Sequence, residues 1–246
     1  MAQSATATRP AGRLHDEVRT ILAVRILSGA YPQGSVLPNE AELSLELGVS
    51  RTSIREAIRV LSAKGLVESR QRVGTRVRPD DDWNRLDPEV LAWGADLEPD
   101  ASFVRGLLEA RRIIEPAAAE LAALRATGRD LMTIEGAYDR MSRSLAHDLD
   151  ACTEADLDFH TAILRASHNP VLSQLASVIG AALRAGFRVS TSLTRGYERT
   201  LRAHGDVLEA IRLRQPEQAR SGMLLLIDLA AEDFGELLSP PVEPRR

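Results

Sequence analysis

One aspartate and two histidines form the pattern in this sequence that is best suited to bind a metal. Asp156 and His160 lie four residues apart in ADLDFHTAILRASHNP, so on a helix they share one face. His204, in RAHGDVLEAI, is a candidate third ligand from a later helix. One carboxylate and two imidazoles suit a divalent transition metal such as Zn, Ni or Mn, and they leave coordination positions open for water or ligand oxygens. An ordinary helix-surface interaction between Asp156 and His160 is the alternative.

A second group of polar residues is basic and lies near the N-terminus. Apolar residues repeat at helical spacing in SRTSIREAIRVL, and the polar side chains on the opposite face are Arg51, Thr52 and Arg55. An arginine near the start of such a helix can donate two parallel hydrogen bonds to guanine in the major groove. We therefore expect Arg51 and Arg55 to read bases, with a merely solvated helix surface as the alternative.

Local signals place these arginines on the second helix of a helix-turn-helix. Asn39 and Glu42 have the spacing of a capping box, which predicts a short helix from Glu40 to Leu47. Gly48 allows a tight turn, and Ser50 can cap the helix that carries the arginines. The two short helices are therefore expected to be joined by a tight turn.

The segment LVESRQRVGTRVRP, after Lys64-Gly65, predicts two brief strands joined by a turn near Val73-Gly74. A hairpin in this place is a wing. We expect Arg70 and Arg72 to contact phosphate or the minor groove, and Gly74 to let the backbone approach the DNA closely.

Beyond the wing, Pro79 and three successive aspartates mark a boundary, because proline resists helix and like charges repel. Turn signals then separate segments with helical periodicity, and the predicted helices span Pro88–Asp96, Ser102–Arg125, Arg129–Ala146, Ala151–Ser167, Pro170–Phe187, Tyr197–Arg214 and Pro216–Leu238.

The expected fold is mainly α, with a winged helix-turn-helix followed by an all-α antiparallel helical bundle that binds a ligand. The expected parts are a disordered tail, a DNA-binding domain, a linker with a connecting helix, and an effector-binding domain, over residues 1–10, 11–79, 80–100 and 101–240.

Charge is distributed unevenly between these parts. Residues 1–79 contain 12 Lys or Arg and 7 Asp or Glu, a net charge of +5, whereas the remainder contains 19 and 28, a net charge of −9. A polyanion partner is therefore expected for the first part only. The single cysteine, Cys152, excludes an intrachain disulfide and a CxxC site. Without a signal-peptide or membrane-spanning pattern, we expect a cytoplasmic protein that does not contact membranes.

The segment VLPNEAELSLELGVSRTSIREAIRVLSAKGLVESRQRVGTRV closely resembles the winged helix-turn-helix of GntR-type bacterial regulators. The resemblance implies that Arg51, Thr52, Arg55 and Gly74 contact DNA. Many members carry a further arginine where this chain has Ala41, so either the sequence preference differs or binding depends more on the wing.

Three later segments, EARRIIEPAAAELAA, DLDFHTAILRASHNPVL and the stretch around His204, resemble the FadR-type ligand-binding domain, called FCD, of one branch of that family. In metal-containing members, residues that match Asp156, His160 and His204 bind the ion together with a histidine on the last helix. Here Leu226 occupies that position, which implies a three-ligand site that is weaker or more hydrated.

The same resemblance gives two candidate effector-binding residues. Arg111 matches the position that commonly holds a carboxylate, and the alternative is an internal salt bridge to Glu115, its i+4 neighbour. Thr200, one turn before His204, could donate to a ligand hydroxyl, with a helix-capping or surface role as the alternative.

The segment DDWNRLDPEVLAWG resembles the linker of sugar-acid responsive members, including a D-galactonate-responsive group that also lacks the last-helix histidine. The resemblance therefore implies that the effector is a sugar acid or a related small carboxylate. We expect a homodimer, because two-fold symmetric operators need paired DNA-binding units, and a repressor that releases its operator when the effector binds. An enzyme is the rival class, but the sequence offers no accompanying general base, nucleophile motif or phosphate loop. A purely architectural DNA-binding protein is the third alternative.

Overall fold

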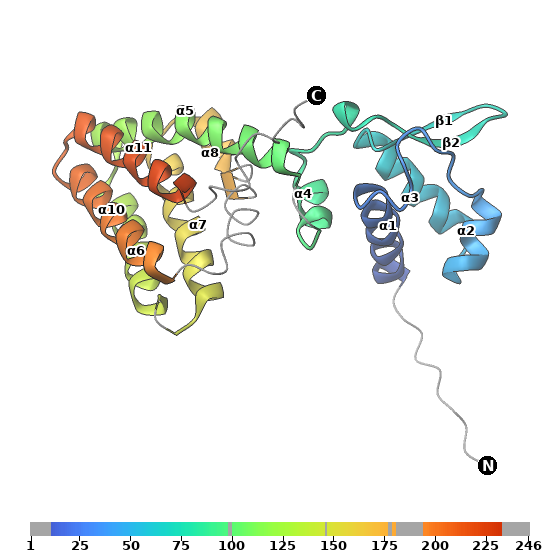
Figure 1. Ribbon diagram of the computed structural model, residues 1–246, viewed down its shortest axis with the longest axis horizontal. Coiled ribbons are helices and arrows are strands. Elements are labelled where there is room, and N and C mark those ends of the chain that lie inside the picture. Colours follow the sequence, from blue (N-terminus) through green and yellow to red (C-terminus); the bar gives the residue numbers. More distant parts are fainter. Residues whose placement is uncertain (1–10, 98–99, 146, 177–178, 181–193, 233–246) are drawn as a thin grey trace, which may run out of the picture. The chain divides into compact units, whose positions relative to one another are not determined.

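A computed structural model describes residues 11–97, 100–145, 147–176, 179–180 and 194–232 of the chain. The chain divides into two compact units, residues 1–98 and 99–246 (Figure 1). The predicted tail over residues 1–10 lies outside the described residues.

The first unit contains a helix-turn-helix. Helix α1 spans Ala11–Leu27, α2 spans Glu40–Leu47 and α3 spans Arg51–Ala63. The predicted capping box is confirmed, because Asn39 Oδ1 accepts from the backbone N–H groups of Ala41 and Glu42, and Glu42 Oε2 accepts from the Asn39 N–H. Gly48 ends α2 with a φ of 65°, a left-handed conformation that suits glycine and makes the turn short. Side chains from all three helices form one apolar core, among them Leu22, Ile26, Leu43, Ile54 and Leu61.

The wing is a two-stranded antiparallel hairpin. Strand β1 spans Val67–Arg70 and β2 spans Gly74–Val77, with Val67 opposite Val77 and Arg70 opposite Gly74. The base of the hairpin is anchored because the side chains of Val67 and Val77 are buried in the core of the first unit. Toward the turn, Ser69 and Arg70 of β1 and Gly74 of β2 are exposed, so this end of the hairpin projects from the first unit (Figure 1).

The segment after the wing also packs on the first unit. A short 3-10 helix, η1, spans Asp80–Asp82, and α4 spans Pro88–Gly94. Val90 and Trp93 of α4 are buried in the same core as the helix-turn-helix. Lys64 at the end of α3 lies 2.7 Å from a carboxylate oxygen of Asp87 and 2.7 Å from one of Glu89. Helix α4 is therefore part of the first unit.

The second unit contains only helices among the residues that the structure describes. They are α5 (Ala101–Arg125), α6 (Gly128–Ser144), α7 (Leu149–Ala166), α8 (Pro170–Gln174), α10 (Thr194–Arg212) and α11 (Pro216–Glu232). Helix α6 packs against α7, α11 packs against α5 and α10, and α5 also contacts α7. The helix predicted over Pro170–Phe187 has a turn at Leu175, and its last residues lie outside the described part. The mainly α fold class is confirmed.

The core of the bundle combines small and large apolar side chains. Fully buried alanines on α5 allow neighbouring helices to approach closely, and Phe159 and Ile163 on α7 fill the interior. Among the described helices, none combines the length and apolar character that crossing a bilayer requires.

Candidate functional site

The exposed face of α3 carries the arginines that the sequence singled out. Ser50 caps the helix by accepting from the Ser53 N–H at 3.1 Å. Ile54 and other apolar residues of α3 point into the core. Arg51, Thr52 and Arg55 are all exposed, close to the first turn of the helix. The first turn of α3 therefore presents a basic surface.

Arg55 has a partner that sequence reasoning missed. Its Nε and Nη2 atoms donate to the two carboxylate oxygens of Glu40, at 3.2 and 2.7 Å. Glu40 is the first residue of α2, 15 residues earlier, so the pair depends on how α2 and α3 pack. The two short helices are thus joined across their exposed faces by a two-point ion pair.

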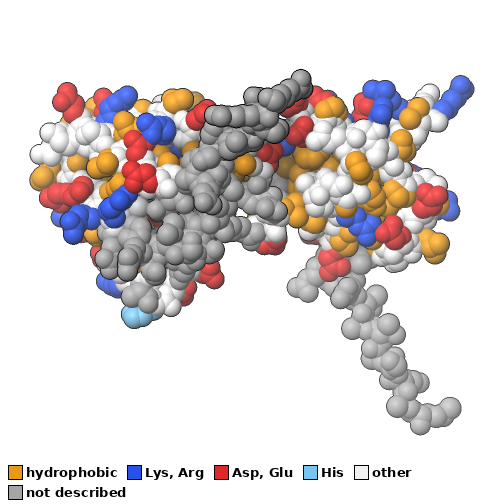
Figure 2. Space-filling view, viewed as in Figure 1, with side chains coloured by type: hydrophobic (Ala, Val, Ile, Leu, Met, Phe, Trp, Pro, Cys, Tyr) orange, Lys and Arg blue, Asp and Glu red, His pale blue; other side chains and the backbone are white. Residues whose placement is uncertain are grey.

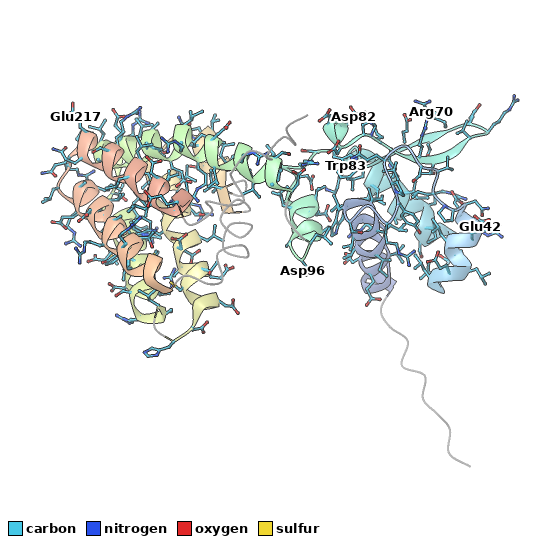
Figure 3. The ribbon with its side chains drawn as sticks, viewed as in Figure 1. Glu42, Arg70, Asp82, Trp83, Asp96 and Glu217 are labelled. Atoms are coloured by element: carbon cyan, nitrogen blue, oxygen red, sulfur yellow. The ribbon has the colours of Figure 1, made fainter. Side chains whose placement is uncertain are left out.

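The wing adds exposed arginines to the first unit (Figure 2). Arg70, at the end of β1, extends from the hairpin (Figure 3) and lies 2.8 Å from Glu68. Arg72 is exposed in the turn and has a positive φ of 64°. Gly74 is exposed at the start of β2. All three residues lie at the far end of the hairpin.

In the second unit, the predicted metal-ligating residues meet in the interior. Asp156 and His160 lie on α7 and His204 lies on α10, and each is at most 5% exposed. One potential ligand atom from each of the three residues lies within 4.8 Å of the others. Oδ1 of Asp156 is 2.8 Å from Nε2 of His204 and 3.9 Å from Nε2 of His160. The three residues form the buried polar cluster of this unit.

The orientation of His204 leaves its inner nitrogen facing the carboxylate. Nδ1 of His204 lies 2.7 Å from the carbonyl oxygen of Thr200, and a carbonyl can only accept, so Nδ1 carries the proton. In the neutral ring Nε2 then presents a lone pair toward Asp156, which is also an acceptor. A positive charge between the two atoms, either a second proton or a metal ion, resolves this conflict. The contact of Thr200 with the cluster is through its backbone, and its side chain is half-buried.

His160 is oriented by a chain of charges from α5. Its Nδ1 atom is 2.5 Å from Oε2 of Glu115, and Oε1 of Glu115 accepts from Nε of Arg111, also at 2.5 Å. Arg111 thus forms the internal salt bridge that was one of its two predicted alternatives. Burial alone raises the pKa of Glu115, but the charges and hydrogen bonds of Arg111 and His160 outweigh it and lower the pKa to about 2. Glu115 is therefore an ionised carboxylate in the interior.

These residues fit a divalent metal ion. Asp156 Oδ2 is buried and has no hydrogen-bond partner, as expected of an atom that would bind a cation, and His204 Nε2 faces the other carboxylate oxygen with its lone pair. Each histidine has an outer partner at Nδ1, Glu115 for His160 and the Thr200 carbonyl for His204, which directs its Nε2 atom inward. Leu226 on α11 is 2% exposed and packs in the apolar core. Since a leucine side chain offers no ligand atom, the groups that would hold the ion are one carboxylate and two imidazoles.

Comparison with known proteins agrees with both units. Residues 14–77 match the gntR family of bacterial regulatory proteins, and residues 106–229 match the FCD domain. The chain is 38% identical over 223 residues to the galactonate operon transcriptional repressor of Escherichia coli K12, covering 90% of this chain and 97% of that protein. It is 31% identical over 217 residues to the Uxu operon regulator of Haemophilus influenzae, covering 86% and 78%.

Solved structures show the same architecture. A GntR protein of Streptococcus agalactiae aligns with a TM-score of 0.50 at 28% identity, covering 89% of this chain and 99% of that chain. The Listeria monocytogenes protein Lar aligns with a TM-score of 0.66 at 23% identity, covering 90% and 97%, and so supports the fold alone.

A winged helix-turn-helix followed by a helical sensing unit defines a DNA-binding transcription regulator, and the matched relatives are regulators rather than enzymes. The chain belongs to the gntR family of bacterial regulatory proteins, in the branch that carries an FCD domain.

Proposed function

We propose that this protein is a repressor that binds operator DNA as a homodimer and releases it when a sugar acid binds in the helical unit. The observation that carries the proposal is the buried polar cluster beside Arg111, which is a site suited to an acidic, oxygen-rich small molecule. The similarity to a repressor named for the galactonate operon supports a sugar acid as the effector.

On the DNA side, Arg51, Thr52 and Arg55 contact base edges from the start of α3. Arg70, Arg72 and Gly74 contact the backbone or the minor groove from the wing. The exposure of all six residues supports this assignment. A homodimer supplies two such surfaces for a two-fold symmetric operator.

On the effector side, Asp156, His160 and His204 hold a divalent ion such as Zn, Ni or Mn. When bound, the ion supplies a Lewis acid that coordinates the carboxylate and hydroxyl oxygens of the effector. Arg111 balances the effector's charge through its guanidinium, and Thr200 donates to a hydroxyl. Because Leu226 has no ligand atom, three protein ligands would leave coordination positions that oxygens of the effector can fill.

Regulation follows from a difference in affinity. The effector binds one arrangement of the dimer more tightly than another, and the DNA-binding units differ in spacing between the two arrangements. The operator fits only one spacing of the two DNA-binding units. An effector that favours the other spacing therefore weakens the complex with DNA.

The test is a binding titration with duplexes from the intergenic regions beside the gene. The full-length protein, prepared with and without divalent metal, is titrated by fluorescence anisotropy before and after addition of D-galactonate and related aldonates. We expect tight binding to at least one duplex and a weaker complex with one acid, and light scattering should give twice the chain mass of 26.9 kDa. Sequence-specific binding that no acid changes would favour a purely architectural role.

A further inference from the structure

The pairing of Arg55 with Glu40 uses one particular edge of the guanidinium group. An arginine side chain presents two edges that can each donate two parallel hydrogen bonds, one formed by Nε and Nη2 and one by Nη1 and Nη2. Glu40 accepts from Nε at 3.2 Å and from Nη2 at 2.7 Å, so it occupies the first edge. The second edge, at the tip of the side chain, keeps its donors directed away from Glu40.

The tip edge has the geometry that guanine recognition requires, because O6 and N7 of guanine accept two parallel hydrogen bonds from one arginine. A free arginine side chain has four torsions to fix before it can make such a contact. Glu40 fixes the plane of the guanidinium in advance. The Arg55 side chain is 66% exposed and that of Glu40 is 37% exposed, so the pair lies where DNA can reach it.

Glu40 itself is held in place. It begins α2 directly after Asn39, whose capping box with Glu42 fixes the first turn. The hydrogen bond from Arg55 is the largest influence on the pKa of Glu40 and lowers it, opposed by partial burial and helped by the charges of Arg55 and Arg51. The carboxylate is therefore ionised at neutral pH. As an exposed ion pair it adds little to folding stability, so its main effect is on geometry.

We propose that Glu40 is a positioning residue for sequence recognition, which aligns the guanidinium of Arg55 so that its tip edge reads a guanine. This inference rests on the proposed base-reading role of Arg55. Glu40 does not itself contact the base, and its carboxylate repels nearby phosphates, so its contribution is selectivity rather than affinity.

The test is selection from a library of duplexes with a randomised core, using the full-length protein. The parent, Glu40→Gln, Glu40→Ala and Arg55→Ala are compared after sequencing the bound fraction. The matched control is Glu56→Gln, which removes the same charge from an exposed glutamate on α3 that also acts electrostatically on Arg55 but whose ion-pair partner is Arg59. Glu56→Gln therefore separates the effect of a lost negative charge from that of a lost alignment.

We expect the parent to prefer guanine at one position of each half-site, and Arg55→Ala to lose that preference. In both Glu40 variants the preference at that same position should fall roughly fivefold or more, a part of the discrimination that a bidentate arginine–guanine pair provides. Glu56→Gln should keep the parent's preference while its affinity for all duplexes rises slightly.

Two results would overturn the role of Glu40. One is a Glu40→Gln profile that matches the parent at every position, and the other is a sharper guanine preference, which would mean that Glu40 withholds Arg55 from DNA. If the parent protein enriched no sequence at all, the result would instead contradict the proposed sequence-specific DNA binding, on which this inference rests.

Discussion

At the scale of single residues, the buried polar cluster is organised by atoms outside it. Glu115 and the Thr200 carbonyl each hold the Nδ1 side of one histidine, so both inner Nε2 atoms face Asp156. Such outer partners fix the tautomer and the ring plane before a metal arrives. The three side chains are thus oriented for a cation, although Leu226 on α11 supplies no further ligand.

Removal of one imidazole should abolish metal retention. We expect His160→Ala to lower metal affinity at least about 100-fold, the upper end of the cost of losing an outer partner. Metal content after dialysis, measured by mass spectrometry, checks this. The matched control is His147→Ala, which removes an exposed histidine between α6 and α7. Equal metal content in the two variants would exclude His160 from the site, and DNA binding without effector should survive in both.

Arg111 offers a test of effector recognition. Arg111→Ala should abolish the rise in melting temperature that a bound sugar acid gives the parent. It should also destabilise the helical unit by roughly 3–5 kcal/mol, because the buried carboxylate of Glu115 loses its guanidinium partner and keeps only His160. Arg111→Lys keeps a charge beside Glu115 but loses the planar fork, so it should restore stability more than effector binding.

The control for this experiment is Arg112→Ala. Arg112 is the next residue on α5, is half-exposed, and pairs with Asp228 on α11. We expect it to keep the response to the acid. An equal thermal response in Arg111→Ala and the parent would favour a purely structural salt bridge.

The sequence identified the members of the cluster better than their partners. Asp156 and His160 could be placed on one helix face from their spacing alone, whereas the meeting of α7 and α10 required the structure. Glu115 was visible only as the i+4 neighbour of Arg111, because its contact with His160 spans 45 residues and depends on how α5 packs on α7. Local periodicity does not determine such contacts.

At the scale of elements, the short helices of the first unit could be predicted from the sequence because their start and stop signals are local. The spacing of Asn39 and Glu42 gave the start of α2, and its bounds of Glu40–Leu47 are those of the structure. The docking of α4 could not be predicted, because tertiary packing brings Lys64 over the ring of Trp93. The interaction of Arg55 with Glu40 was missed for the same reason.

Gly65 joins α3 to the wing and should not tolerate a side chain. Its φ is +78°, and a Cβ atom there would collide with the backbone oxygen of Asp82. We expect Gly65→Ala to destabilise the first unit by about 2 kcal/mol or more, because alanine resists the left-handed conformation and Asp82 must move. Thermal unfolding followed by tryptophan fluorescence measures this unit selectively, since the two tryptophans of the chain are Trp83 and Trp93.

Gly94→Ala is the matched control in the same unit. Gly94 ends α4, and the nearest atom to an added Cβ would be a Leu27 methyl at 3.9 Å. We expect the melting temperature to stay constant or rise slightly, because alanine favours helix over glycine. A similar loss in both variants would mean that the position of Asp82 is not a constraint.

At the scale of the whole molecule, charge separates the two tasks of the chain. Residues 1–79 carry a net charge of +5 and the remainder carries −9. Raising the salt from about 50 to 200 mM should weaken the duplex complex roughly a thousandfold if a dimer neutralises about six phosphates. Affinity for a sugar acid, measured by calorimetry in the same buffers, should change far less because Arg111 is buried. Equal salt dependence of the two would place the acid on the exposed basic surface.

Glu115 faces Arg111 with one oxygen and His160 with the other, so under the proposed function one carboxylate would connect the acid site with the ion site. If the guanidinium of Arg111 turned toward an incoming acid, the carboxylate of Glu115 would interact more strongly with His160. His160 would then bind its ion more tightly. Because such coupling is reciprocal, a cell short of the metal would need more of the acid before its genes respond. The repressor would in that case report nutrient supply and metal supply together.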